Sequence, residues 1–200
     1  MNEPSREPVY CEQCSTTVGA IDQLANGLRL YKWSLCISTP TSKHPATYPL
    51  SHFLTAHLLA HISSQAVNKF ILRSSNPDIP IPTASNSTAS RPTSLGPTAS
   101  SPAILHLWVF APYLTISLSK SGPETAQLIK ASKIFYRPIS DQECANMLGK
   151  ASMSVEEVQL PTEVMTNLVE TLWRSTIAIP ESARKFREWD VGFLERFVEG

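Results

Sequence analysis

The sequence predicts an α+β fold: a largely antiparallel sheet with a few packed helices and a long disordered insertion. Strand-like segments come in blocks, and a few helical patterns separate these blocks. The chain has 200 residues, of which 42% are hydrophobic, so it is long enough for one globular domain with a real core. We therefore expect a single domain over residues 1–200.

The first clear strand runs from Leu28 to Ile37, where apolar and polar residues alternate and aromatic residues are frequent. Asn26 and Gly27 supply the turn before it. A helix is expected from Ser51, its N-cap, to Ser64, because four apolar residues recur there at helical spacing: Leu54, Leu58, Leu59 and Ile62. Residues 70–72 then form a short strand.

Residues 73–102 differ in composition from everything around them. They contain six prolines and twelve serines or threonines, with almost no charge. Such a segment buries too little apolar surface to offset the entropy cost of ordering it, so we expect a disordered insertion. Closing a long flexible loop costs little more than closing a short one, so the strand-like flanks can still pair in one sheet.

Three more strands are expected after the insertion, with a turn at Pro112 and Tyr113, a turn at residues 121–123 and a short helical turn at 124–129. The three strands are Ile104–Phe110, Leu114–Leu118 and Ala131–Tyr136.

The C-terminal part combines helices with an apolar closing segment. A short helix is expected at Asp141–Leu148, and a wide apolar stripe predicts a longer one at Thr162–Ser175. Residues 181–197 carry too many apolar side chains for a free tail, so we expect this segment to dock on the core.

Charge and composition exclude several classes of function. Lys and Arg total 17, as do Asp and Glu, so the chain lacks the basic character typical of proteins that bind nucleic acid directly. The longest apolar run is too short to cross a membrane, and the first residues do not resemble a secretory signal. We therefore expect a cytoplasmic or nuclear protein with no membrane contact. No phosphate-binding loop or hydrolase nucleophile elbow is present.

The four cysteines are the residues most able to carry chemistry. Cys11 and Cys14 have the spacing of one half of a structural zinc site, and the alternative is a pair of unligated surface thiols. Cys36, Cys144 or His44 can complete a zinc site only if folding brings them close. Cys36 and Cys144 are also candidate nucleophiles, and Cys144 lies near a helix start, where the helix dipole favours a thiolate.

Several segments together resemble the HECT-like ubiquitin-conjugating enzyme (E2)-binding family, which is regarded as a group of atypical E3 ubiquitin ligases. The similarity is to the C-terminal part of these proteins, fungal members in particular, and the last segment is the most specific. The segments are Cys11–Cys14 with Gly19, Leu30–Trp33, Phe53–Phe70, Leu107–Phe110, Ile134–Tyr136 and Ile179–Arg196.

The resemblance implies an E2 partner and a role in protein ubiquitination. Family members are longer and carry an earlier cysteine pair, so Cys11 and Cys14 look like the second pair of a zinc site. HECT ligases accept ubiquitin on a cysteine that follows threonine, whereas Cys36 follows leucine and Cys144 follows glutamate. The resemblance therefore implies ubiquitin transfer by positioning of the E2 rather than by a thioester on this chain.

The resemblance also implies a protein partner from the mRNA 3′-end processing machinery, and a neutral chain agrees with recruitment that needs no RNA contact. The alternative function is a non-enzymatic scaffold or chaperone-like binding protein. In either case a few buried aromatic anchors would supply the binding energy. The candidate anchors, each of which can instead be a core residue, are Trp173, Trp189, Phe193 and Phe197.

Overall fold

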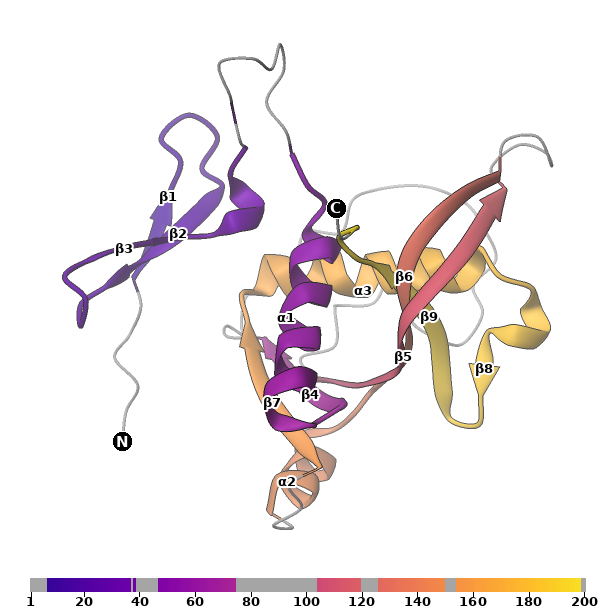
Figure 1. Ribbon diagram of the computed structural model, residues 1–200. Helices are drawn as coiled ribbons and strands as arrows, with labels where there is room; N and C mark the ends of the chain where they lie inside the picture. Colours follow the sequence, from indigo (N-terminus) through magenta and orange to yellow (C-terminus); the bar gives the residue numbers. More distant parts are fainter. Residues whose placement is uncertain are drawn as a thin grey trace. The chain divides into compact units, whose positions relative to one another are not determined.

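The computed structural model describes residues 7–36, 38, 47–74, 104–119, 126–149 and 154–198 (Figure 1). Contacts divide the chain into two compact units, Met1–Pro49 and Leu50–Gly200. Most of the predicted insertion and the predicted turn at 121–123 lie outside the described residues. Each unit is built around its own sheet.

The first unit is a small antiparallel sheet of β1 (Pro8–Tyr10), β2 (Thr17–Asp22) and β3 (Gly27–Leu30). A turn ending at Asn26, whose φ is 47°, joins β2 to β3 as predicted. The prediction of a strand as far as Ile37 was wrong: β3 ends at Leu30, and the chain turns into the short 3-10 helix η1 (Lys32–Ser34). The rings of Tyr31 and Trp33 stack there with centroids 4.7 Å apart. The alternating pattern over residues 28–37 therefore covers a short strand and a 3-10 turn in which two aromatic rings stack.

The second unit contains a six-stranded sheet in the order β7-β4-β5-β6-β9-β8. Every neighbouring pair is antiparallel except β4 and β7, which are parallel. The strands are β4 (Lys69–Ser74), β5 (Ile104–Ser119), β6 (Ala126–Pro138), β7 (Val155–Leu160), β8 (Lys185–Phe186) and β9 (Trp189–Glu195). The flanks of the predicted insertion, β4 and β5, are neighbours as expected, although Arg73 and Ser74 belong to β4 rather than to the insertion.

Two predictions about the central hairpin were wrong. The turn expected at Pro112 is absent, because β5 continues through it with two register shifts against β6. Bulges admit proline into a strand, and the Pro112 carbonyl accepts a hydrogen bond from the hydroxyl of Ser132 at 2.7 Å. Residues 126–129, expected in a helical turn, pair with β5 as part of β6.

The three predicted helices are confirmed as α1 (Leu50–Gln65), α2 (Asp141–Gly149) and α3 (Thr162–Ile177). Helices α1 and α3 touch each other and contact β9, whereas α2 contacts β7 (Figure 1). Both long helices pack on the same face of the sheet, because they contact each other and both contact β9. Thr55 of α1 and Thr176 of α3 also donate to backbone carbonyls of β9. The largest buried side chains lie between these helices and the sheet or within its central strands.

The predicted fold class, α+β with a largely antiparallel sheet, is confirmed. The C-terminal segment docks on the core as expected, because β9 pairs with β6 and Leu194 is fully buried. Over the described part of the chain, no helix is both long and apolar enough to cross a membrane.

Candidate functional site

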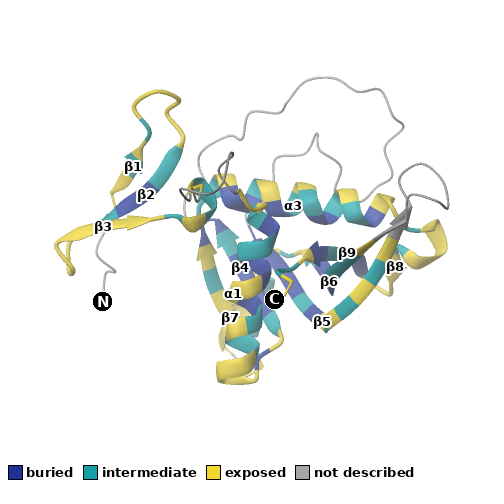
Figure 2. Cartoon of the chain, turned by 45° about the horizontal axis from the view of Figure 1, so that its top comes forward, coloured by how far each residue is buried: buried dark blue, intermediate teal, exposed yellow. Residues whose placement is uncertain are grey.

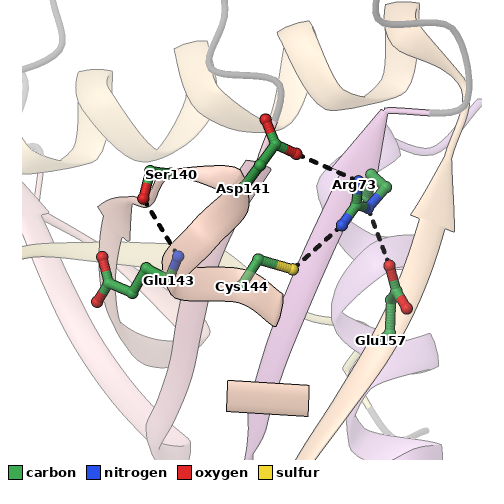
Figure 3. A network of polar contacts seen from close by, with 6 residues as sticks. All are labelled: Arg73, Ser140, Asp141, Glu143, Cys144 and Glu157. Carbon is green, nitrogen blue, oxygen red and sulfur yellow. Dashed lines mark hydrogen bonds and ion pairs between the residues drawn. The ribbon is translucent and has the colours of Figure 1, made fainter. Parts of the chain in front are cut away.

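The candidate site is built around the first turn of α2, which begins at a serine cap. The backbone N–H of Glu143 donates to Ser140 Oγ at 3.2 Å, and the N–H of Cys144 donates to the Ser140 carbonyl at 2.9 Å (Figure 3). Serine followed three residues later by glutamate is a common helix-start pattern. Asp141 and Glu143 also place negative charge where the helix dipole favours it.

Cys144 points from this turn into the core. Its side chain is 0% exposed and packs against Ile71 of β4 and Ile104 of β5. Partly buried apolar side chains close the cluster around it: Ile139, Met147 and Val155. In this conformation the thiol offers no surface to a second protein.

Arg73 is the one charged side chain that the described structure places against this thiol. Its Nη2 donates to Cys144 Sγ at 3.2 Å and its Nε donates to Glu157 Oε1 at 2.9 Å, while Nη1 is 3.5 Å from Asp141 Oδ1 (Figure 3). Burial disfavours the charged form of Arg73, but its contacts with Cys144 and Glu157 outweigh that effect and raise its pKa. The guanidinium therefore ties α2, β4 and β7 together around a sulfur atom.

This arrangement has two opposed chemical properties. Reactive cysteines typically lie beside a cation, and the guanidinium of Arg73 is such a neighbour of Cys144. Complete burial, however, withholds the sulfur from any thioester on another protein. The geometry is that of a structural thiol in the conformation described, and a catalytic role for Cys144 stays a prediction.

The other three cysteines belong to the first unit. Cys11 and Cys14 lie on the tight turn between β1 and β2, where Ser15, with φ 56°, donates its N–H to the Cys11 carbonyl at 2.9 Å. Cys14 Sγ is 3.3 Å from Thr16 Oγ1, and hydrogen bonding to Thr16 lowers the pKa of this exposed thiol. Cys36 is exposed beyond η1.

The turn that carries Cys11 and Cys14 suits one half of a zinc site, because both thiols lie on one short loop and the pKa shift of Cys14 favours the thiolate. Across the described residues, no group of three or more His, Cys, Asp or Glu side chains is arranged to hold a metal ion. His44 lies outside those residues. The pair therefore fits a shared site only if further ligands come from elsewhere.

The four predicted partner anchors occupy different places. Trp189 is buried in a cluster with Phe135 and Val191, and Phe193 is half-buried on the same strand, β9. Trp173 is half-buried on α3. Phe197 meets the rings of Phe53 and His52 of α1 edge to face, with centroids 5.3 and 5.1 Å away. The four residues thus come from β9, from α3 and from the segment after β9, and their role in binding a partner stays a prediction.

Two groups of residues escaped the sequence reasoning. Arg73 was assigned to the insertion, although the alternation of Lys69, Ile71 and Arg73 marks one face of a strand. Trp108 and Phe110 were expected only as parts of a strand, and their spacing of two places both on one face. In both cases the sequence contained the signal, which is the alternation of side chains between the two faces of a strand.

Comparison with known proteins gives one family and one distant relative. A family model described as "HECT-like Ubiquitin-conjugating enzyme (E2)-binding" matches residues 1–191. An uncharacterized protein of the fission yeast Schizosaccharomyces pombe, C1734.10c, is 22% identical over 191 residues, which cover 94% of this chain and 48% of that protein. The chain thus spans about half the length of that relative. No solved structure matches.

Proposed function

Because the chain belongs to the HECT-like ubiquitin-conjugating enzyme (E2)-binding family, we propose that it binds an E2 and promotes protein ubiquitination as an atypical E3 ligase. The proposed mechanism is positioning: the chain holds a ubiquitin-charged E2 near a substrate lysine and raises the effective concentration of one near the other. The activity of a longer relative is not carried over to this chain, which covers only 48% of it.

The observation that favours positioning over a covalent step is the complete burial of Cys144. Transfer through a thioester requires the E2-bound ubiquitin carbonyl to reach a cysteine sulfur. A sulfur enclosed by Ile71 and Ile104 is not reachable without displacing α2 from the sheet. Cys36 is exposed, so it remains the cysteine that a covalent alternative would have to use.

A discharge assay tests the proposal. The chain is added to a panel of ubiquitin-charged E2 enzymes, and loss of the thioester is followed on gels with and without reductant. We expect faster discharge of at least one E2, with no reductant-sensitive adduct on the chain, and equal rates for wild type, Cys36→Ser and Cys144→Ser. An adduct that disappears in Cys36→Ser or Cys144→Ser would replace positioning by covalent transfer. No acceleration of any E2 would support a non-enzymatic scaffold instead.

We also propose that Cys11 and Cys14 supply two of the four ligands of a structural zinc site. Bound zinc would hold the turn between β1 and β2 in one conformation. The support is the shared turn and the lowered pKa of Cys14. Metal analysis of the purified chain tests the idea: zinc lost in Cys11→Ser and in Cys14→Ser supports it, whereas zinc retained in both variants contradicts it.

The further partner that we propose is a protein of the mRNA 3′-end processing machinery, in the nucleus or the cytoplasm. Equal numbers of acidic and basic residues favour recruitment through a protein rather than through RNA. Co-purification of a tagged chain with 3′-end processing factors after ribonuclease treatment tests this partner. Loss of the association on ribonuclease treatment would contradict it.

A further inference from the structure

The six-stranded sheet has a second face, opposite to α1 and α3. Along β5, Leu105, Leu107 and Val109 are buried, whereas the alternating positions belong to the other face. Cross-strand pairing extends this second face, because Trp108 is opposite Phe135 of β6, and Phe135 is opposite Val191 of β9. Helix α2 lies over one end, where Cys144 packs on Ile71 and Ile104.

Aromatic side chains gather beyond α2 on this face. We call the aromatic face the set of Trp108, Phe110, Phe135, Phe186 and Trp189. Ring centroids of Phe110 and Phe135 are 4.7 Å apart, and those of Phe135 and Phe186 are 5.1 Å apart, both pairs stacked. Trp108 meets Phe135 edge to face at 5.3 Å. The side chains of Phe110 and Phe186 remain 49% and 44% exposed, and Figure 2 shows exposed residues on β5 and β8.

The stacking constrains what this face can hold. Rings stacked across neighbouring strands have their planes turned toward each other, so their edges point away from the sheet. The flat surfaces of Phe135 are occupied by Phe110 and Phe186. Recognition of single-stranded nucleic acid depends on free ring surfaces for the bases. Apolar side chains, by contrast, pack well against ring edges.

Cations surround the aromatic face. Lys69 Nζ is 5.2 Å from the centre of the Trp108 ring, Lys133 Nζ is 5.6 Å from that of Phe110, and the guanidinium of Arg187 is 5.6 Å from that of Phe186. Among the described residues, none of these three cations forms an ion pair with a carboxylate. The exposed Glu188 follows Arg187 in the same turn, but this single carboxylate does not offset the three cations.

The same face contains polar nitrogen atoms that are buried without a hydrogen-bond partner in the described structure. They are Nε1 of Trp108 and both ring nitrogens of His106, whose side chain lies 4.7 Å from the Trp189 ring. An indole N–H can only donate, and buried donors are almost always paired in folded proteins. These nitrogens have no accessible surface, so they do not take part in contacts with a partner in this conformation.

We propose that the aromatic face binds an extended acidic segment of a partner protein that also carries apolar side chains. Carboxylates of the segment pair with Lys69, Lys133 and Arg187, and its apolar side chains pack on the exposed rings of Phe110 and Phe186. The charge complementarity and the exposed aromatic rings carry this inference. It is independent of whether the chain binds an E2.

A peptide-binding experiment tests the inference on the whole chain. The probe is a fluorescein-labelled peptide of alternating glutamate and leucine, and binding is followed by fluorescence anisotropy at physiological salt. We expect saturable binding by wild type, with binding roughly fivefold to tenfold weaker in the double variant Lys69→Gln/Lys133→Gln, as expected for the loss of two exposed ion pairs.

The matched control is Lys130→Gln, which removes the same charge from β6. The side chain of Lys130 points to the opposite face of the sheet from that of Lys133, and it binds Thr115 Oγ1 at 2.9 Å. We expect Lys130→Gln to bind the peptide like wild type, and thermal melts to show that all variants are folded.

Four results would overturn the inference. The first is no binding of the glutamate–leucine peptide, and the second is equal binding of a lysine–leucine peptide. The third is binding of oligouridylate that weakens in Lys69→Gln/Lys133→Gln, because it would assign the face to nucleic acid. A polyglutamate peptide that binds as tightly as the probe would contradict the apolar contacts with Phe110 and Phe186.

Discussion

The hydroxyl pair of Tyr136 and Thr176 gives a stability prediction that can be worked out atom by atom. Thr176 Oγ1 lies 2.7 Å from the Tyr136 hydroxyl, 2.9 Å from the Leu172 carbonyl and 2.8 Å from the Val191 carbonyl. A threonine hydroxyl has one hydrogen, and the carbonyls can only accept it, so Tyr136 must donate to Thr176. The pair joins α3 to β6 and β9 in the core.

The two single substitutions should therefore differ in cost. Tyr136→Phe removes one neutral hydrogen bond and leaves no buried donor unpaired, so we expect a loss of about 1 kcal/mol. Thr176→Val strands the buried Tyr136 hydroxyl and removes the donor to the carbonyls, so we expect about 2–3 kcal/mol. The double variant should cost less than the sum, because it removes the stranded donor as well.

Urea denaturation of the four proteins followed by circular dichroism measures these differences, with Thr166→Val as a control. Thr166 donates to the Thr162 carbonyl one turn earlier in α3 and is only half-buried, so its loss should be smaller. Equal costs for Tyr136→Phe and Thr176→Val, or strict additivity in the double variant, would refute the assignment of donor and acceptor.

Burial also raises the pKa of Tyr136 above its ordinary value, and the negative charge of nearby Asp190 acts in the same direction. The unfolded chain releases this proton near pH 10, whereas the folded chain retains it. The stabilising effect is therefore complete below about pH 10 and is lost as the pH rises further. Wild type should lose stability at alkaline pH more steeply than Tyr136→Phe.

Three further predictions concern the sheet and the buried thiol. Gly192→Ala should lower the free energy of unfolding by about 1–3 kcal/mol in thermal or urea melts, because the added Cβ would lie 2.9 Å from Ser175 Oγ. In the control Gly149→Ala the added Cβ meets nothing within 4 Å, so this variant should melt like wild type apart from the higher helix propensity of alanine. In Ellman's titration Cys144 should react only when the protein unfolds; immediate reaction of all four thiols in the native protein would show that α2 opens readily. Burial, followed by the nearby charges of Arg137 and Lys69, lowers the pKa of His106 to about 4. Neutral His106 should therefore stabilise the fold above about pH 6.5, and this stability should be lost as the pH falls toward 4. An NMR titration midpoint near pH 6.5 for His106 would contradict this.

Periodicity predicted the helices better than the strands. The apolar stripe on α3 has a period that only a helix produces, and Pro161 and Pro180 bracket it in the sequence. Pro112 misled because proline usually ends a strand, whereas here a bulge in a long hairpin admits it. Whether a proline falls at a bulge depends on the register of the partner strand, which local sequence does not contain.

The candidate site was predictable only in part. Local sequence placed Cys144 near the start of a short helix, and the structure shows that Ser140 caps this helix. Its complete burial depends on Ile71 and Ile104, and its contact with Arg73 spans 71 positions in the chain. The aromatic face likewise needs the order of the strands, because Trp108, Phe135 and Phe186 come from three separate segments.

Direct binding between this chain and a panel of purified E2 enzymes tests the central claim most directly. With each E2 immobilised and the chain in solution, biolayer interferometry should show saturable, reversible binding to at least one E2, unaffected by Cys144→Ser. Binding to none of them, by a chain that circular dichroism shows to be folded, would contradict the account that this part of the family is sufficient to recognise an E2.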